Sequence, residues 1–564
     1  MKKQRINKSN RFKIFALGAA VLVLVALIIL AIVLFSKSGI SVPGDYRTIQ
    51  AAVEAAKDGD VIVVEPGVYY ERVDFMGKNI TIRSKNPDDP DVVADTIIDG
   101  RKRGSVVTFS GGESHDAVLK GFTITGGIGT REATVQLFEG EEITIEGTYG
   151  GGILVTNGSS PTIEQNFIKG NSVDIDGGGI AILDGSSPLI RNNTIKGNRA
   201  LNGGGISIWS SSPIIEDNNI FENITLNVGA GISLYTEASA RVSNNDIHDN
   251  MAGEGGGGIA VIASDPLISG NNIYENNSRD SGGGLFIVAS SPTIDGNDIN
   301  KNSAVVEGGG IMIVAGAAPT VSSNTIIGNY CDDNGGGIAV AGAAEPIIID
   351  NVISGNVVLA GGGGIYVREA SSVIERNRIS GHRVAQDGGG IAIIDNSTAT
   401  IVENVIDDNI AGRYGGGLLV GNDSSVDIKD NTISRNVASQ GGAVFVLRSK
   451  VIFERNVVND NLAVSESGGG LSVVSNATAV VTGNSFEGNK AFELGGAIVA
   501  FENVLLILSG NDFIGNEADT GGAFIGLDSV VEISDPDDNT YSGNVPEDID
   551  SEDEELTENG AQDQ

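Results

Sequence analysis

The segment GGGIAILDGSSPLIRNNTIKGN, residues 177–198, is one unit of a repeat that runs through most of the chain. Its opening signature is a run of glycine followed by an aliphatic or aromatic residue. That residue returns at intervals of 26 or 27 positions, at Ile153, Ile180, Ile206, Ile232, Ile259, Leu285, Ile311, Ile338, Ile365, Ile391, Leu418, Val444, Leu471, Ile498 and Phe524. A period of this length is typical of solenoids.

Each unit also contains a second signature, apolar-x-x-Asn-x-apolar-x-x-Asn. In the quoted unit it consists of Ile190, Asn193, Ile195 and Asn198. Both asparagine positions recur throughout the repeat, and His382 replaces the second one in a single unit. Asparagine tolerates a left-handed backbone and bonds to nearby peptide groups, and stacked asparagines can bond to one another.

These signatures predict a parallel β-helix in which each unit forms one coil of three short strands. Small or aliphatic residues follow the first aliphatic residue at a spacing of two, the period of a strand with one inward face. The glycines suit a backbone that has positive φ or approaches the next coil closely. The glycine content and the many β-branched residues exclude a helical repeat.

The beginning of the repeat region resembles the pectin-lyase-like superfamily of right-handed parallel β-helices. The similar segments are residues 48–60, TIQAAVEAAKDGD, and residues 61–69, VIVVEPGVY. The resemblance implies an N-terminal capping helix with Ile49, Val53 and Ala56 on one face, followed by the first coil. It covers residues 42–545 and specifies the fold but not the activity, because this scaffold carries many activities.

Two of the superfamily's enzyme signatures are absent. The Gly-His-Gly of polysaccharide hydrolases does not occur, and Asp265-Pro266 continues with Leu267 rather than the histidine of epimerases. Calcium-dependent lyases need clustered aspartates and a basic residue, which is too loose a pattern to exclude. The sequence does not decide whether the chain is an enzyme. It favours a binding protein over an enzyme.

The composition restricts the partners. The formal net charge of −37 argues against nucleic acid and disfavours polyanionic sugars unless cations bridge the two. The single cysteine, Cys331, excludes an intrachain disulfide.

The N-terminus predicts a membrane anchor. Six basic residues lie within residues 1–13, and the uncharged apolar run 14–35 would form a helix of about 33 Å, enough for a hydrocarbon core of about 30 Å. The positive end is expected in the cytoplasm and everything after Ser36 outside, in a single-pass arrangement. A cleaved signal peptide is the alternative.

The sequence therefore divides into six parts. A basic tail (1–13) and the anchor (14–35) precede the cap and early coils (42–125), an insertion (126–149), the regular repeats (150–545) and an acidic tail (546–564) that reads as disordered. Alternating residues within the insertion suit a small projecting hairpin.

Acidic residues precede several glycine runs, at Asp280, Glu307 and Asp333. In stacked coils such residues lie about 5 Å apart, where they would bind a hard cation such as Ca²⁺ or have raised pKa values. A solvated turn edge is the alternative. His382, with Arg383 and Asp387, is a candidate acid–base group, although a single substitution at a tolerant turn explains it equally.

The outward positions of the glycine-led strand form a long apolar stripe that includes Trp209, Tyr235, Phe286 and Tyr366. Large exposed apolar patches mark interaction sites, and aromatic rings can stack on sugars. Covering loops or packing of two rods are the alternatives.

The leading hypothesis is an extracytoplasmic, membrane-anchored rod that binds a polysaccharide or a surface protein through its lateral face. The alternative is a Ca²⁺-dependent polysaccharide lyase that uses the acidic residues.

Overall fold

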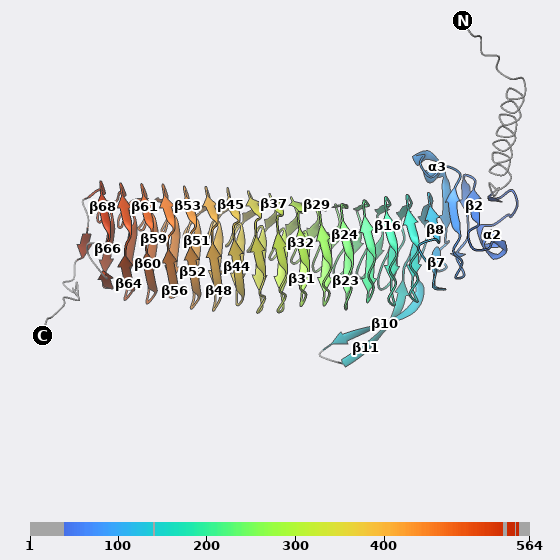
Figure 1. The fold of residues 1–564 in the computed structure, drawn as a ribbon, viewed down its shortest axis with the longest axis horizontal. Coiled ribbons are helices and arrows are strands. Elements are labelled where there is room, and N and C mark those ends of the chain that lie inside the picture. The colour runs from blue at the N-terminus through green and yellow to red at the C-terminus, as the bar shows by residue number, and fades with distance from the viewer. Residues whose placement is uncertain (1–38, 139–140, 534–537, 547–548, 552–564) are drawn as a thin grey trace, which may run out of the picture.

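The computed structural model describes residues 39–138, 141–533, 538–546 and 549–551, which stack as β-coils into one rod (Figure 1). Four parallel sheets run along it. Sheet 1 extends from β4 (Val73–Asp74) to β69 (Ile549–Ser551), and sheet 2 from β1 (Ile40–Val42) to β67 (Val530–Ile533). Sheet 3 extends from β3 (Gly67–Tyr69) to β68 (Thr540–Ser542), and sheet 4 from β18 (Arg199–Ala200) to β62 (Lys490–Ala491).

One regular coil contributes a strand to each sheet. In the coil that begins at Ile206 these are β19 (Ile206–Trp209), β20 (Ile214–Glu216), β21 (Asn219–Phe221) and β22 (Ile224–Thr225). The prediction of three strands was therefore one short. The fourth strand has only two residues, too few for a period of two to be visible in the sequence.

The glycine-led strands stack in register. Ile206 of β19 pairs with Ile232 of β23 (Ile232–Tyr235), and Ile208 pairs with Leu234. Within the described residues this pairing continues without a break from β12 (Ile153–Val155) to β66 (Phe524–Leu527), which confirms one continuous stack. The inward residues are fully buried in a single core, where each aliphatic side chain contributes about 2 kcal/mol.

Both asparagine columns form hydrogen-bonded ladders. The Oδ1 atom of Asn245 accepts from the backbone N and the Nδ2 of Asn218, each at 3.0 Å, and Asn218 Nδ2 also donates to Ile190 O at 2.9 Å. The stacking was predicted, but the left-handed backbone was assigned to the wrong residue. It belongs to the preceding position, Asp217, with φ 55°. The asparagine is selected for its amide.

The glycine runs meet two separate requirements. The first glycine takes positive φ, 57° at Gly203, and a Cβ there would lie 2.6 Å from Ser207 Cβ. The third glycine lies against the next coil, since a Cβ on Gly205 would lie 2.5 Å from Gly231 O. Positive φ and close approach were both expected, and they fall on different members of the run.

A short helix, α2 (Ile49–Ala55), lies at the N-terminal end of the rod (Figure 1). Thr48 caps it by accepting from Ala51 N, and the Glu71 carboxylate accepts from Ile49 N and Gln50 N. Ile49 and Val53 are buried in the main core, on the face that the sequence predicted. A second helix, α3 (Pro90–Asp95), follows the Asp89 N-cap and was not anticipated.

The insertion forms an antiparallel pair, β10 (Thr130–Phe138) and β11 (Glu141–Tyr149), which projects from the rod as expected (Figure 1). Across the part of the chain that the structure describes, no helix has the length and apolar character to cross a bilayer. The anchor expected at residues 14–35 and most of the acidic tail lie outside the described residues.

Candidate functional site

The apolar stripe on sheet 1 points away from the core, as predicted, but the expected exposure was wrong. Trp209, Tyr235 and Tyr366 are only 4%, 5% and 4% exposed, and Phe286 is partly buried. Trp209 stacks on Tyr235 with ring centroids 4.5 Å apart. Because Trp209 and Tyr235 each cover one face of the other, those faces cannot stack on a sugar. A role of the stripe in binding stays a prediction.

In several coils the segment just before the glycine run packs over the stripe, as Ile175 and Val228 do beside Trp209 and Tyr414 does beside Phe445. At Asp176 this segment bridges Tyr149 and Asn202 of the adjacent coils. The Asp176 carboxylate accepts from Trp209 Nε1 at 2.7 Å and from Asn202 Nδ2 at 2.9 Å. Burial raises the pKa of Asp176 to about 6, although these two hydrogen bonds oppose the rise. A second apolar layer therefore lies outside sheet 1, which the linear pattern could not reveal.

The three acidic residues do not share one environment. Asp280 and Asp333 are exposed, whereas Glu307 is buried and lies 3.3 Å from Arg368 Nη2, two coils further along the rod. Burial raises the pKa of Glu307, and the Arg368 charge opposes this rise. Among the residues that the structure describes, no group of three or more His, Cys, Asp or Glu side chains is arranged to hold a metal ion.

His382 occupies the rung of the ladder that asparagine fills elsewhere, and it is fully buried. Its Nδ1 accepts from Asn356 N at 3.1 Å, and its Nε2 lies 3.1 Å from Ile353 O. A neutral ring with its proton on Nε2 satisfies both contacts, so the imidazole replaces the amide as acceptor for the backbone N and as donor to the backbone carbonyl, but not as acceptor for the preceding asparagine Nδ2. Burial lowers its pKa to about 4. Of its proposed acid–base partners, Asp387 instead binds Arg413, with Nη2 at 2.5 Å from Oδ2.

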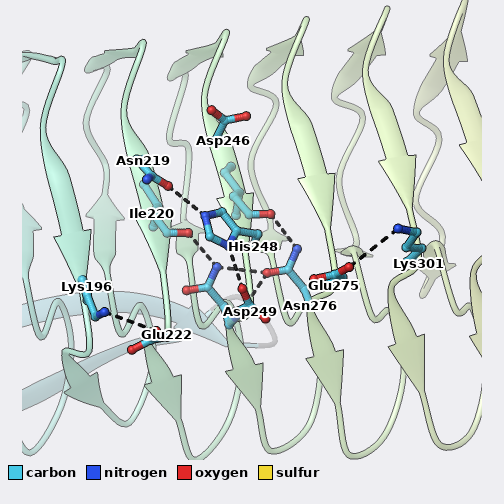
Figure 2. Close-up of polar contacts among 12 residues, drawn as sticks. Lys196, Asn219, Ile220, Glu222, Asp246, His248, Asp249, Glu275, Asn276 and Lys301 are labelled. Atoms are coloured by element: carbon cyan, nitrogen blue, oxygen red, sulfur yellow. Dashed lines mark hydrogen bonds and ion pairs between the residues drawn. The ribbon is translucent and has the colours of Figure 1, made fainter.

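The outer face of sheet 3 carries a row of polar and aromatic side chains, several of which are drawn in Figure 2. It spans β17 (Thr194–Lys196), β21, β25 (Asp246–His248), β29 (Asn272–Tyr274) and β33 (Asp298–Asn300). Each strand places two side chains outward, and in-register pairing lines these up along the rod. The polar row comprises Lys196, Asn219, Phe221, Asp246, His248, Asn272, Tyr274, Asp298 and Asn300.

His248 lies at the centre of the polar row. Its Nε2 is 3.0 Å from Asn219 Oδ1 on the previous coil, and its Nδ1 is 2.8 Å from Asp249 Oδ2. Further along, Asn272 Nδ2 donates to Asp246 Oδ1 at 3.2 Å. These cross-coil contacts hold the side chains in one arrangement before any ligand binds.

The aromatic members of the polar row stack face to face along the rod axis. The His248 ring is 4.8 Å from Phe221 and 4.7 Å from Tyr274, with interplanar angles of 8° and 12°. Lys196 Nζ lies 4.7 Å over the remaining face of Phe221. Both faces of Phe221 and of His248 are therefore covered, and one face of Tyr274. Partial burial and the nearby carboxylates of Asp246, Asp249 and Glu275 raise the pKa of Tyr274.

A cavity of about 350 Å³ opens at the N-terminal end of sheet 3. One wall comes from the α3 region, including Asp88 and Val93, and the other from Gln165, Phe167 and Thr194. Gln165 Nε2 donates to Asp88 Oδ1 at 3.0 Å, whereas its Oε1 is buried without a hydrogen-bond partner among the described residues. The cavity adjoins the strands that carry the polar row.

The polar row was missed by the sequence analysis, although a signal for it existed. Phe221, His248 and Tyr274 each follow the aliphatic residue between the two asparagines of their unit. Aligning the units at that position would have revealed three consecutive aromatic rings. Their mutual stacking depends on the register between coils.

The family comparison agrees with this architecture. The family described as "Right handed beta helix region" matches residues 105–266, 227–358, 267–421 and 416–552. These matches cover more than half of the chain, which therefore belongs to the right-handed β-helix family, as the resemblance implied.

Solved structures that are similar to this chain include an epimerase module and a lyase. The mannuronan C-5 epimerase AlgE6 A-module of Azotobacter vinelandii shares 13% identity over 89% of this chain and 94% of its own, with a TM-score of 0.18. A mutant of the PL6 family alginate lyase AlyGC shares 12% identity over 91% and 100%, with a TM-score of 0.19. No curated protein matches the chain.

Proposed function

We propose that this protein is a β-helix rod that binds an extended, uncharged glycan along the outer face of sheet 3. The single observation that supports this most is the polar row, in which hydrogen-bonding side chains repeat on consecutive coils of one sheet. Coils are spaced about 4.8 Å apart, so a linear polymer lying along the rod meets a similar set of groups at each step. Asparagine, aspartate, histidine and tyrosine together supply both donors and acceptors to hydroxyl groups.

The ligand is proposed to be uncharged on electrostatic grounds. The chain has a net charge of −37, and Asp246, Asp249, Glu275 and Asp298 lie in or beside the polar row. An acidic polysaccharide would be repelled, and no described group of side chains offers a bridging cation site. The same reasoning gives no support to the Ca²⁺-dependent lyase as a second function.

The cavity beside α3 is proposed to hold one end of the glycan. The unpartnered Gln165 Oε1 is suited to accept a hydroxyl hydrogen there, and the Phe167 ring and Val93 provide apolar contact. A chain seated in the cavity would continue over Thr194 and Lys196 toward His248.

The membrane-anchored, extracytoplasmic location remains part of the proposal. It rests on the basic residues 1–13 and the apolar run 14–35, and we infer in addition that α2 closes the N-terminal end of the core. Protease added to intact cells is expected to degrade the repeat region, and full protection would contradict an outside location.

Binding can be tested with the full chain and a panel of neutral and uronic-acid polysaccharides in affinity electrophoresis or calorimetry. We expect binding to a neutral polymer, weakened about 10-fold or more in the double variant Asn219→Ala, His248→Ala. This estimate assigns roughly 1 kcal/mol to each lost set of hydrogen bonds. Tyr330→Ser, an exposed aromatic on sheet 4, is the matched control and should bind as the unaltered protein does. A preference for uronates, no binding to any polymer, or equal binding by the double variant would contradict the proposal.

A further inference from the structure

Sheet 4 presents a second unusual surface, the most apolar exposed face of the rod. Its outward positions are the first and third residues after the second asparagine of each unit, and the intervening residue is buried. Leu226, Val305, Leu359, Val464 and Phe492 occupy third positions and are 72%, 47%, 50%, 48% and 61% exposed. Gly253, Arg279, Asp332 and Gly412 are among the residues that lie between these five in the column. The other outward column adds the exposed residues Met251, Tyr330, Val357 and Leu462. Nine large apolar residues exposed on one narrow face mark it as an interaction site.

The charges on this face differ from those of the whole chain. Its two outward columns carry the cations Arg199, Arg279, Arg383 and Lys490 and the anions Asp332, Glu517 and Asp519. This near balance contrasts with the net charge of −37. Electrostatic repulsion between copies is therefore weaker at this face than the net charge of the chain suggests.

Rotating a second copy by 180° about an axis over β42 (Val357–Val358) reverses the order of the coils along the face. The residues of the two copies that then face each other are complementary. Five strands before β42 lies the coil of Leu226, and five strands after it lies the coil of Phe492. Six coils from β42 on either side, at the two ends of the face, lie Arg199 and Glu517, both at the first outward position. A twofold axis parallel to the strands and passing over Leu359 keeps each outward column opposite itself, so that Leu226 meets the coil of Phe492 and Arg199 meets Glu517.

The steric pattern has the same symmetry. Val305 would face Gly412, and Val464 would face Gly253, so bulky side chains meet glycines. The most exposed member, Leu226, would face a hollow of about 360 Å³ lined by Val464, Phe492 and Asp519. A protruding leucine opposite a hollow is the shape that an isologous interface requires.

The area is also adequate. Thirteen coils at about 4.8 Å give a length of about 58 Å. With a width of about 12 Å for two outward columns, each copy would bury about 700 Å², or about 1,400 Å² in total, within the range of roughly 1,200–2,000 Å² for stable complexes.

We propose that sheet 4 is a self-association surface, through which two copies of this chain pair antiparallel about a twofold axis over Leu359. The N-terminal ends of the two rods then lie at opposite ends of the dimer, and both sheet 3 faces stay free for ligand. This pairing is independent of what sheet 3 binds.

Disulfide trapping in the full-length chain tests the axis. Leu359→Cys lies next to its own copy and should give a covalent dimer under mild oxidation. Val305→Cys is the matched control, since its two copies would be about 19 Å apart along the rods, beyond the roughly 7 Å that a disulfide spans. The native Cys331 is buried and does not interfere. Absence of the Leu359→Cys dimer, or equal trapping at Val305→Cys, would overturn the antiparallel arrangement.

Charge exchange provides a second readout in the Leu359→Cys background. Glu517→Arg should reduce the covalent dimer at least fivefold, because the introduced arginine then faces Arg199 of the other copy as a like charge. Adding Arg199→Glu should restore it. A yield unaffected by the single change, or not restored by the double change, would overturn the proposal, and melting temperatures confirm that each exposed substitution leaves the fold intact.

Discussion

Replacing His382 by asparagine, the residue that this ladder position carries in the other units, isolates the effect of one buried imidazole. The folded pKa of about 4 lies below the ordinary value of 6.5 because burial disfavours the cation. The unfolded chain therefore binds the proton more tightly. The resulting stability is fully present above about pH 6.5 and is lost as the pH falls toward 4.

The magnitude follows from these two pKa values. Lowering the pH from 7 to 5 should cost the unaltered protein about 2 kcal/mol through this group. In the variant His382→Asn the restored amide can accept from Asn356 Nδ2, as in the other rungs, and titrates nowhere in this range. The variant should be equal or slightly more stable at pH 7 and clearly more stable at pH 5.

The assay is denaturant unfolding of both proteins at pH 7, 6 and 5, with the difference between them as the readout. All other carboxylates and histidines are common to the two proteins, so their titration cancels. If the free energies of unfolding of the two proteins change in parallel between pH 7 and pH 5, the proposed effect of His382 is refuted. The buried imidazole would then be protonated in the folded state without a loss of stability.

Three further predictions concern stability. Asn351→Ala should cost about 1–3 kcal/mol, because the backbone N of Asn324 loses its acceptor Oδ1, and an unchanged melting temperature would count against the ladder. Trp209→Ser should cost about 3–5 kcal/mol through a cavity and an unpaired Asp176, and recovery of the fold at full stability would show that the stripe is exposed after all. Arg368→Ala should cost on the order of 2 kcal/mol, less than a fully buried pair because Arg368 is 39% exposed; thermal unfolding that matches the unaltered protein would show that Glu307 has another partner.

The sequence by itself determined the β-helix, its period and its inward residues, because a strand with one buried face repeats with period two and each coil repeats the same turn chemistry. It also identified the asparagine columns, although the left-handed residue is the one before each asparagine, as at Asp217. Only the tertiary structure decided which outward residues are accessible. Trp209 and His248 both point away from the core, yet Trp209 is buried under the segment containing Asp176, whereas the polar row around His248 is partly exposed on the outside of sheet 3. The physical reason is that the exposure of an outward side chain depends on which neighbouring segments fold over it. Residues that are neighbours in the row also come together only because coils stack, although they are 26 or 27 positions apart in the sequence.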